Sequence, residues 1–114
     1  MSREALGEFE QLVLLAIIRL GAAGTDAIYG VPIVDEIERR TSRHVARAAV
    51  YISLRRLEQK GMVSTWMAEP TQERGGKSRR CVRITRSGIK ALRESRHAVD
   101  QMWHGLDPRL EKLP

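Results

Sequence analysis

Three helix-forming segments are followed by two strand-like runs in this chain, and that order limits the possible folds more than any other feature. The segment Glu8–Leu20 is nearly continuously apolar, which predicts a first helix buried on more than one side. A second helix is expected to begin within residues 29–31 and to end near Thr41, because Pro32 is tolerated only in the first turn of a helix. A third helix is expected over Ala46–Lys60, where a glycine follows the last residue.

The two strand-like runs are Met62–Met67 and Arg80–Thr85, and the segment between them contains a proline and a Gly-Gly pair. These features predict a two-stranded hairpin with a basic tip. Three helices followed by such a hairpin are the order of a winged helix-turn-helix, so we expect a mainly α fold with a small β-hairpin, in the α+β class. Thr85 is expected to cap a fourth helix that runs to about Leu106, where Asp107 and Pro108 should end it.

The basic residues are concentrated in the middle of the chain. The net charge is +6 over 114 residues, but residues 43–96 carry 14 basic and 4 acidic side chains, whereas residues 1–42 carry 4 basic and 7 acidic ones. This excess favours a polyanionic partner, with nucleic acid the first candidate, an acidic membrane the second and a merely solvated face the alternative. No apolar run is long enough to span a bilayer and the first residues lack a signal-peptide pattern, so we expect a cytoplasmic protein.

The third helix has two different faces. Val50, Leu54 and Leu57 recur at a helical spacing and are expected to pack, which leaves the opposite face free to bind. Arginine pairs with guanine more often than any other side chain, and arginine and lysine near the hairpin suit phosphates. For Tyr51 a ring packed under the hairpin is the alternative to DNA contact. The candidate DNA-binding residues are Arg43, Arg47, Ala48, Tyr51, Ile52, Arg55, Arg74, Lys77 and Arg79.

Several short motifs then carry a family resemblance over roughly residues 6–93. They are Leu6-Gly7-Glu8-Phe9-Glu10, Tyr29-Gly30, Ala49-Val50-Tyr51, Lys60-Gly61, Glu73-Arg74-Gly75-Gly76-Lys77 and Ile84-Thr85. In this order and spacing the motifs resemble the PadR family of transcriptional regulators. The resemblance implies a dimeric bacterial repressor whose third helix and wing contact operator DNA. It points to Tyr51 and its neighbours and to the turn from Arg74 to Lys77, which adds Gly75 and Gly76 to the DNA-binding set.

The fourth helix carries an apolar stripe that predicts a homodimer. Ile89, Leu92, Arg96, Val99, Trp103 and Leu106 are spaced alternately three and four residues apart, a heptad-like seam interrupted only by the arginine. Packing of this stripe on the first helix of the same chain is the alternative. The expected organisation is a winged helix-turn-helix over residues 1–85, a dimerisation helix over 86–106 and a short tail over 107–114. A two-fold dimer would place two third helices about 34 Å apart and favour an inverted-repeat site.

Phe9 and Trp103 are two of only five aromatic residues, and we expect both near the dimer interface. Because many relatives respond to aromatic or drug-like ligands, these two side chains are the hypothesised effector pocket, with simple core packing as the alternative. No metal site and no cofactor are expected, since His97 and His104 have no further ligand-type residue to complete a set. Cys81 lies beside arginines that would suit a redox sensor, but a packed, inert thiol is the simpler interpretation.

No nucleophile elbow, glycine-rich phosphate cradle or paired-carboxylate motif is present, so we do not expect an enzyme. The sequence therefore predicts a dimeric transcriptional repressor that binds double-stranded DNA at an inverted repeat and is released by a small-molecule effector. The alternative from another class is a winged-helix module whose basic face binds an acidic protein. A basic hairpin tip next to an outward arginine favours the DNA interpretation.

Overall fold

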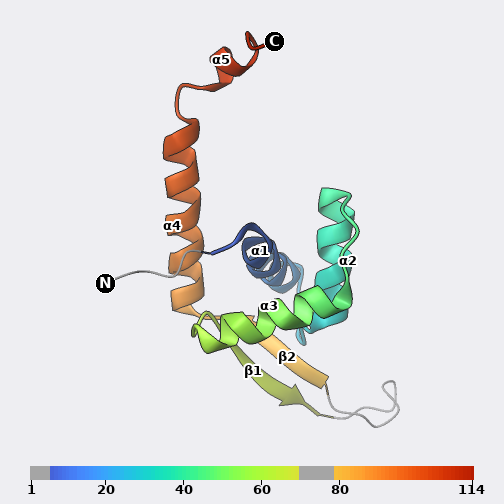
Figure 1. The fold of residues 1–114 in the computed structure, drawn as a ribbon. Helices are drawn as coiled ribbons and strands as arrows, with labels where there is room; N and C mark the ends of the chain where they lie inside the picture. Colours follow the sequence, from blue (N-terminus) through green and yellow to red (C-terminus); the bar gives the residue numbers. More distant parts are fainter. Residues whose placement is uncertain (1–5, 70–78) are drawn as a thin grey trace.

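Helix α1 (Glu8–Ala22) runs through the centre of the molecule (Figure 1). The computed structural model describes residues 6–69 and 79–114. The elements that follow α1 are α2 (Gly30–Thr41), α3 (Arg47–Gln59), β1 (Val63–Ala68), β2 (Arg79–Ile84), α4 (Arg86–Trp103) and α5 (Asp107–Leu110). Helices α2 and α3, strand β2 and the first part of α4 pack around α1. This mainly helical fold with one antiparallel hairpin confirms the predicted fold class.

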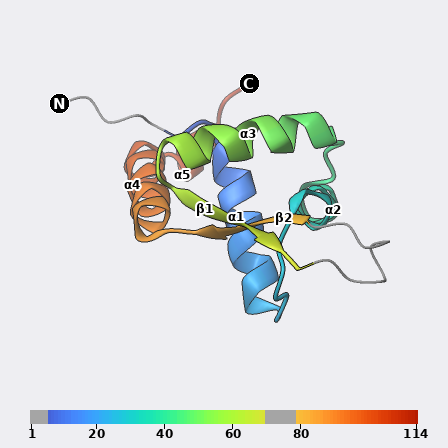
Figure 2. The same ribbon diagram turned by 90° about the horizontal axis from the view of Figure 1, so that it is seen from below.

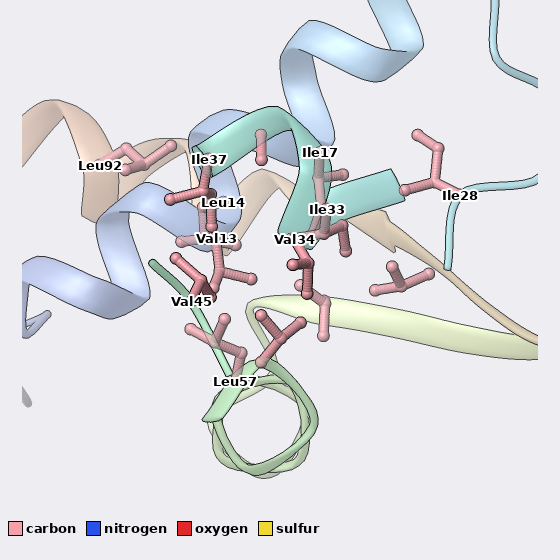
Figure 3. Close-up of a cluster of buried hydrophobic side chains, with 14 of the residues drawn as sticks. Val13, Leu14, Ile17, Ile28, Ile33, Val34, Ile37, Val45, Leu57 and Leu92 are labelled. Atoms are coloured by element: carbon pink, nitrogen blue, oxygen red, sulfur yellow. The ribbon is translucent and has the colours of Figure 1, made fainter. Parts of the chain in front are cut away.

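One apolar stripe from each of the first three helices forms the core (Figure 3). Val13 and Leu14 of α1, Ile33 of α2, and Val50 and Leu57 of α3 are all fully buried. Burying an aliphatic side chain of this size stabilises a fold by about 1.5–3 kcal/mol. A rotation of α3 about its axis would expose Val50 and Leu57, so the core determines which face of α3 points outward.

The hairpin is attached to the helices along its length. Its strands pair in antiparallel register, with Val63 opposite Ile84 at one end and Ala68 opposite Arg79 at the other. The backbone N–H of Val82 also donates to the carbonyl oxygen of Ile28 at 2.8 Å, which joins β2 to the segment before α2. The hairpin therefore has a fixed position relative to α2 and α3.

The predicted starts of α2 and α4 are confirmed. Pro32 is the third residue of α2, in the first turn, where its missing N–H costs no helical hydrogen bond. The hydroxyl of Thr85 accepts a hydrogen bond from the N–H of Gly88 at 3.1 Å and donates to the carbonyl oxygen of Gly61 at 2.7 Å. This cap joins the start of α4 to the turn that ends α3.

The predicted end of the fourth helix is wrong. Helix α4 ends at Trp103 rather than near Leu106, because Gly105 has a left-handed φ of 78° that reverses the chain. Pro108 then lies in the first turn of α5, so the predicted tail contains a short helix and the proline begins a helix instead of ending one.

The second half of α4 projects from the body of the molecule (Figure 1). Leu92 is buried in the core, but every residue from Arg96 to Pro114 is exposed. This arm thus has no buried contact within its own protomer. None of the helices in the described ranges is long and apolar enough to cross a membrane.

Candidate nucleic-acid interface

Helix α3 and the hairpin lie side by side on one side of the molecule, as the view from below shows (Figure 2). Helix α2 lies next to the N-terminal end of α3, and α4 extends away from α3 and the hairpin. The two elements predicted to bind DNA are therefore neighbours, and a single duplex can reach both.

The outward face of α3 is the one that the helical spacing predicted. Arg47, Ala48 and Arg55 are exposed, and Tyr51 and Ile52 are 47% and 49% exposed. An aromatic and an aliphatic side chain thus lie half-exposed next to each other between two exposed arginines. The face presents two arginines, a tyrosine and two small or aliphatic side chains to solvent.

Tyr51 occupies the junction between α3, the hairpin and the start of α2. With Thr65 and Arg80 it lines a small hollow of about 290 Å³ between α3 and the hairpin. The other edge of its ring lies against Gly30, whose Cα would carry any side chain directly into the ring. The ring thus packs against Gly30 and beside the hairpin while it stays 47% exposed, and DNA contact by Tyr51 stays a prediction.

Glu58 connects α3 to the hairpin, a link that the sequence did not predict. Its carboxylate accepts a hydrogen bond from the hydroxyl of Thr65 on β1 and an ion-paired one from Arg80 on β2 at 3.3 Å. The Thr65 hydrogen bond, assisted by the Arg80 charge, lowers the pKa of the Glu58 carboxyl against the opposing effect of desolvation. The link favours one angle between α3 and the hairpin.

Two of the predicted DNA-binding arginines have partners within the protomer. Nη1 of Arg43 lies 2.5 Å from Oε1 of Glu8, and this hydrogen-bonded ion pair lowers the pKa of Glu8 and raises that of Arg43. Arg79 stacks over the ring of Tyr29 at 4.1 Å from its centroid. Because neighbouring residues of a strand face opposite sides, Arg79 points away from α3 while Arg80 points toward it.

The remaining predicted wing residues, Arg74, Gly75, Gly76 and Lys77, lie outside the described residues. In the part of the hairpin that the structure describes, strand β2 carries arginines at positions 79, 80 and 83. Strand β2 is therefore strongly basic, including at its first residue, Arg79.

A second, apolar surface lies between α1 and α4. Leu15 and Ile18 of α1 are 45% and 40% exposed, and together with Ile89 and Val99 of α4 they line a groove of about 940 Å³. The sequence predicted the α4 residues but missed the two on α1. The nearly continuous apolar sequence of α1 could have indicated these two residues, because one side of the helix packs in the core and a second apolar side lines this groove.

The other predicted interface residues lie in varied surroundings. Leu92 belongs to the core of its own protomer, and Phe9 packs partly buried against the same core. Arg96 forms an exposed pair with Asp100 at 3.5 Å. Trp103 and Leu106 are exposed on the projecting arm, at 50% and 39%. Neither Phe9 nor Trp103 lines the groove between α1 and α4.

The described residues include no group of three or more histidine, cysteine, aspartate or glutamate side chains placed to hold a metal ion. Cys81 is fully buried, with Sγ 3.7 Å from the carbonyl oxygen of Arg79. Its neighbour Val82 is also buried, so β2 packs on both of its faces. This burial supports the packed, inert interpretation of the thiol.

Comparison with known proteins decides the family. The model of the transcriptional regulator PadR-like family matches residues 20–94, from the end of α1 to the first half of α4. This chain belongs to the PadR-like family. The PadR-like protein is accordingly a transcriptional regulator and not an enzyme, as the sequence predicted.

Solved structures agree with this fold. A transcriptional regulator from Clostridium thermocellum superposes with a TM-score of 0.67 at 21% identity, covering 87% of this chain and 89% of its own. A PadR family regulator from Eggerthella lenta is 26% identical, with a TM-score of 0.59 and coverage of 92% and 84%. A PadR-like regulator from Bacillus cereus is 17% identical, with a TM-score of 0.62 and coverage of 91% and 88%. No curated protein is significantly similar to the chain in sequence.

Proposed function

We propose that this PadR-like protein is a dimeric repressor that binds a specific double-stranded DNA site. The observation that carries the proposal is the exposed face of α3, where Arg47, Tyr51 and Arg55 lie beside a basic hairpin. An α-helix fits the major groove of B-DNA, about 12 Å wide, and a flanking hairpin can then follow the phosphate backbone.

The side chains of this surface divide into two roles. Arg55 lies in the middle of the exposed face, from which it reads a base edge, and Ala48 and Ile52 suit contact with thymine methyl groups. Arg47 at the start of α3 contacts phosphates, and so do Arg74 and Lys77 of the sequence between the two strands, where Gly75 and Gly76 would allow close backbone approach. Arg43 and Arg79 join them when DNA competes with their partners Glu8 and Tyr29.

The proposed dimer forms through the groove between α1 and α4. Half-exposed apolar side chains from both helices meet there, and the projecting arm has no buried contact in its own protomer. A partner helix in the groove would cover Ile89 and Val99 and bring Phe9, Leu92, Arg96, Trp103 and Leu106 to or near the interface. Two-fold symmetry then presents two α3 helices to successive major grooves, which favours an inverted-repeat operator.

We further propose that a flat aromatic effector binds between the protomers, near Phe9 and Trp103, and releases the operator. Phe9 packs partly buried against the core and Trp103 is half-exposed on the projecting arm, so a ligand held between them at the interface would change how the two protomers sit on DNA. Replacing Trp66 with Phe leaves Trp103 as the only tryptophan. Its fluorescence should then change with an effector from a panel of planar aromatic compounds, and an unchanged signal would contradict this site.

The test of the DNA interface is a comparison of two arginine variants in binding a duplex from the region upstream of the protein's own gene. Arg55→Ala should weaken specific binding by about 10- to 100-fold, the value of one good base contact. Arg109→Ala removes the same charge from α5, far from α3 (Figure 1), and should bind like the parent. Equal effects of the two substitutions would contradict the role of α3.

Failure of the parent protein to bind any duplex at low salt would instead favour a protein-interaction module with an acidic partner. The basic hairpin is compatible with that function, but the exposed aromatic and aliphatic side chains of α3 beside Arg55 are better explained by contact with a DNA groove.

A further inference from the structure

Gly30, the first residue of α2, is buried against the ring of Tyr51 on α3. A Cβ atom at position 30 would lie 2.6 Å from Cζ, 2.7 Å from Cε1 and 2.8 Å from the hydroxyl oxygen of Tyr51. Non-bonded carbon atoms approach favourably to only about 3.5–4.0 Å. Any side chain at position 30 would therefore occupy space that the tyrosine ring now fills.

Backbone conformation does not explain the glycine at this position. Gly24, Gly61 and Gly105 have φ angles of 88°, 75° and 78°, and a Cβ atom at each would meet nothing within 4 Å. Gly30 is a helical residue with no positive φ, where alanine is the better helix former. The atoms that a Cβ would meet belong to the outer part of a half-exposed ring, so a side chain at position 30 would displace the ring, and glycine leaves the ring where it lies.

The contact determines where the tyrosine hydroxyl lies. Tyr51 is 47% exposed on the face of α3 that carries Arg55, and its ring turns on only two side-chain torsions. A ring held on one edge by a neighbouring backbone is already ordered before DNA arrives, so binding costs less conformational entropy. A displaced ring would move the hydroxyl and also intrude on the hollow between α3 and the hairpin.

We propose that Gly30 is a positioning residue: it seats the Tyr51 ring at the start of α2 and so fixes this side chain for contact with operator DNA. The DNA role rests on the proposed function above. The seat, meaning the contact of the Tyr51 ring with Gly30, exists in the protein without DNA. The contact and its role in DNA binding can therefore be tested separately.

The seat is tested first without DNA, by thermal unfolding of the full chain. Gly30→Ala should lower the melting temperature of the parent but should leave the Tyr51→Ala variant unchanged or more stable, because the ring that clashes is gone. Gly21→Ala is the control for a helical glycine with room, since its Cβ would lie 3.9 Å from the nearest atom, on Ile28. This control should melt no lower than the parent. Equal losses from Gly30→Ala in both backgrounds would overturn the seat.

The role in binding is tested with the upstream duplex at fixed salt. Gly30→Ala should weaken affinity by about tenfold, Tyr51→Ala by a similar factor, and the double variant no more than Tyr51→Ala alone. The protein contains only two tyrosines, so a spectrum of ¹³C-labelled tyrosine rings should show the Tyr51 signal moving in Gly30→Ala. If Gly30→Ala does not fold, the affinity of the double variant Gly30→Ala/Tyr51→Ala is still compared with that of Tyr51→Ala. A lower affinity of the double variant would show that Gly30 contributes to binding independently of the tyrosine ring.

The outcomes separate the two claims. Additive losses in the double variant, or unchanged affinity in Gly30→Ala, would overturn the positioning role while leaving DNA binding intact. A parent protein that binds no duplex would overturn the proposed function, and with it the DNA role of Gly30. In that case the unfolding experiment alone would decide whether the ring is seated on the glycine.

Discussion

Replacing Val99 with aspartate should separate the proposed dimer into monomers that remain folded. Val99 is 50% exposed in the protomer and lies on the projecting part of α4, so the substitution disturbs no core contact. The same side chain lines the apolar groove with Leu15 and Ile18, and a partner helix would cover it in the dimer.

The size of the effect follows from these exposures. Burying the exposed half of an aliphatic side chain is worth about 1 kcal/mol, and a carboxylate placed in an apolar interface costs several kcal/mol more unless it regains water. Two-fold symmetry introduces the change twice. The dimer should therefore weaken by at least about 4 kcal/mol, which raises its dissociation constant about 1,000-fold.

Sedimentation equilibrium over a range of protein concentrations measures this shift directly. Gln101→Asp is the matched control, because Gln101 is exposed on the same helix but does not line the groove, and it adds the same charge. The control should keep the parent's mass. Val99→Asp should sediment as a monomer, melt as cooperatively as the parent protomer and lose tight operator binding. A Val99→Asp protein that keeps the dimer mass would refute the groove as the interface.

Three further outcomes follow from the contacts around the proposed DNA interface. The hydrogen bond from Thr65 and the ion pair with Arg80 lower the pKa of the Glu58 carboxyl, so these contacts stabilise the fold above the ordinary carboxyl pKa of 4.5, and their contribution is lost as pH falls through the lower folded value. Glu58→Gln should therefore lower the melting temperature at pH 7 but much less in acid, as measured by circular dichroism. Glu8→Gln should release Arg43 and strengthen non-specific DNA binding, with a steeper dependence on salt; unchanged binding would exclude competition between Glu8 and DNA. Cys81 should react with a disulfide reagent slowly in the native protein and rapidly in denaturant, and a fast native reaction would contradict its burial.

The local features of the fold could be predicted from the sequence because they depend on spacing within one segment. The positions of Val50 and Leu57 determine which face of α3 packs. Thr85 marks the start of α4 because its hydroxyl accepts a hydrogen bond from the N–H of Gly88, three residues further along the chain. The end of α4 was mispredicted because the sequence pattern attaches the stop to Pro108, whereas the left-handed Gly105 ends the helix and the proline begins another.

Contacts between segments could not be predicted. Glu8 and Arg43 are 35 residues apart, and nothing in the spacing of either shows that the fold brings them together. The same holds for the ring of Tyr51 on Gly30, which depends on how α2 and α3 cross. A nearly continuously apolar α1 indicates contact on more than one side, but only the packed structure shows that Leu15 and Ile18 remain exposed.

Sequence-specific DNA binding is tested most directly by the affinity of the unmodified protein for two labelled duplexes. One duplex comes from the region upstream of its gene, and the other has the same bases in scrambled order. Fluorescence anisotropy at several salt concentrations gives both affinities and their salt dependence. A sequence-specific regulator should bind the upstream duplex tighter by about 10³ or more, with a steep loss of affinity as salt rises. Equal affinity for the two duplexes, or no binding to either at low salt, would contradict a sequence-specific regulator acting through α3 and the hairpin.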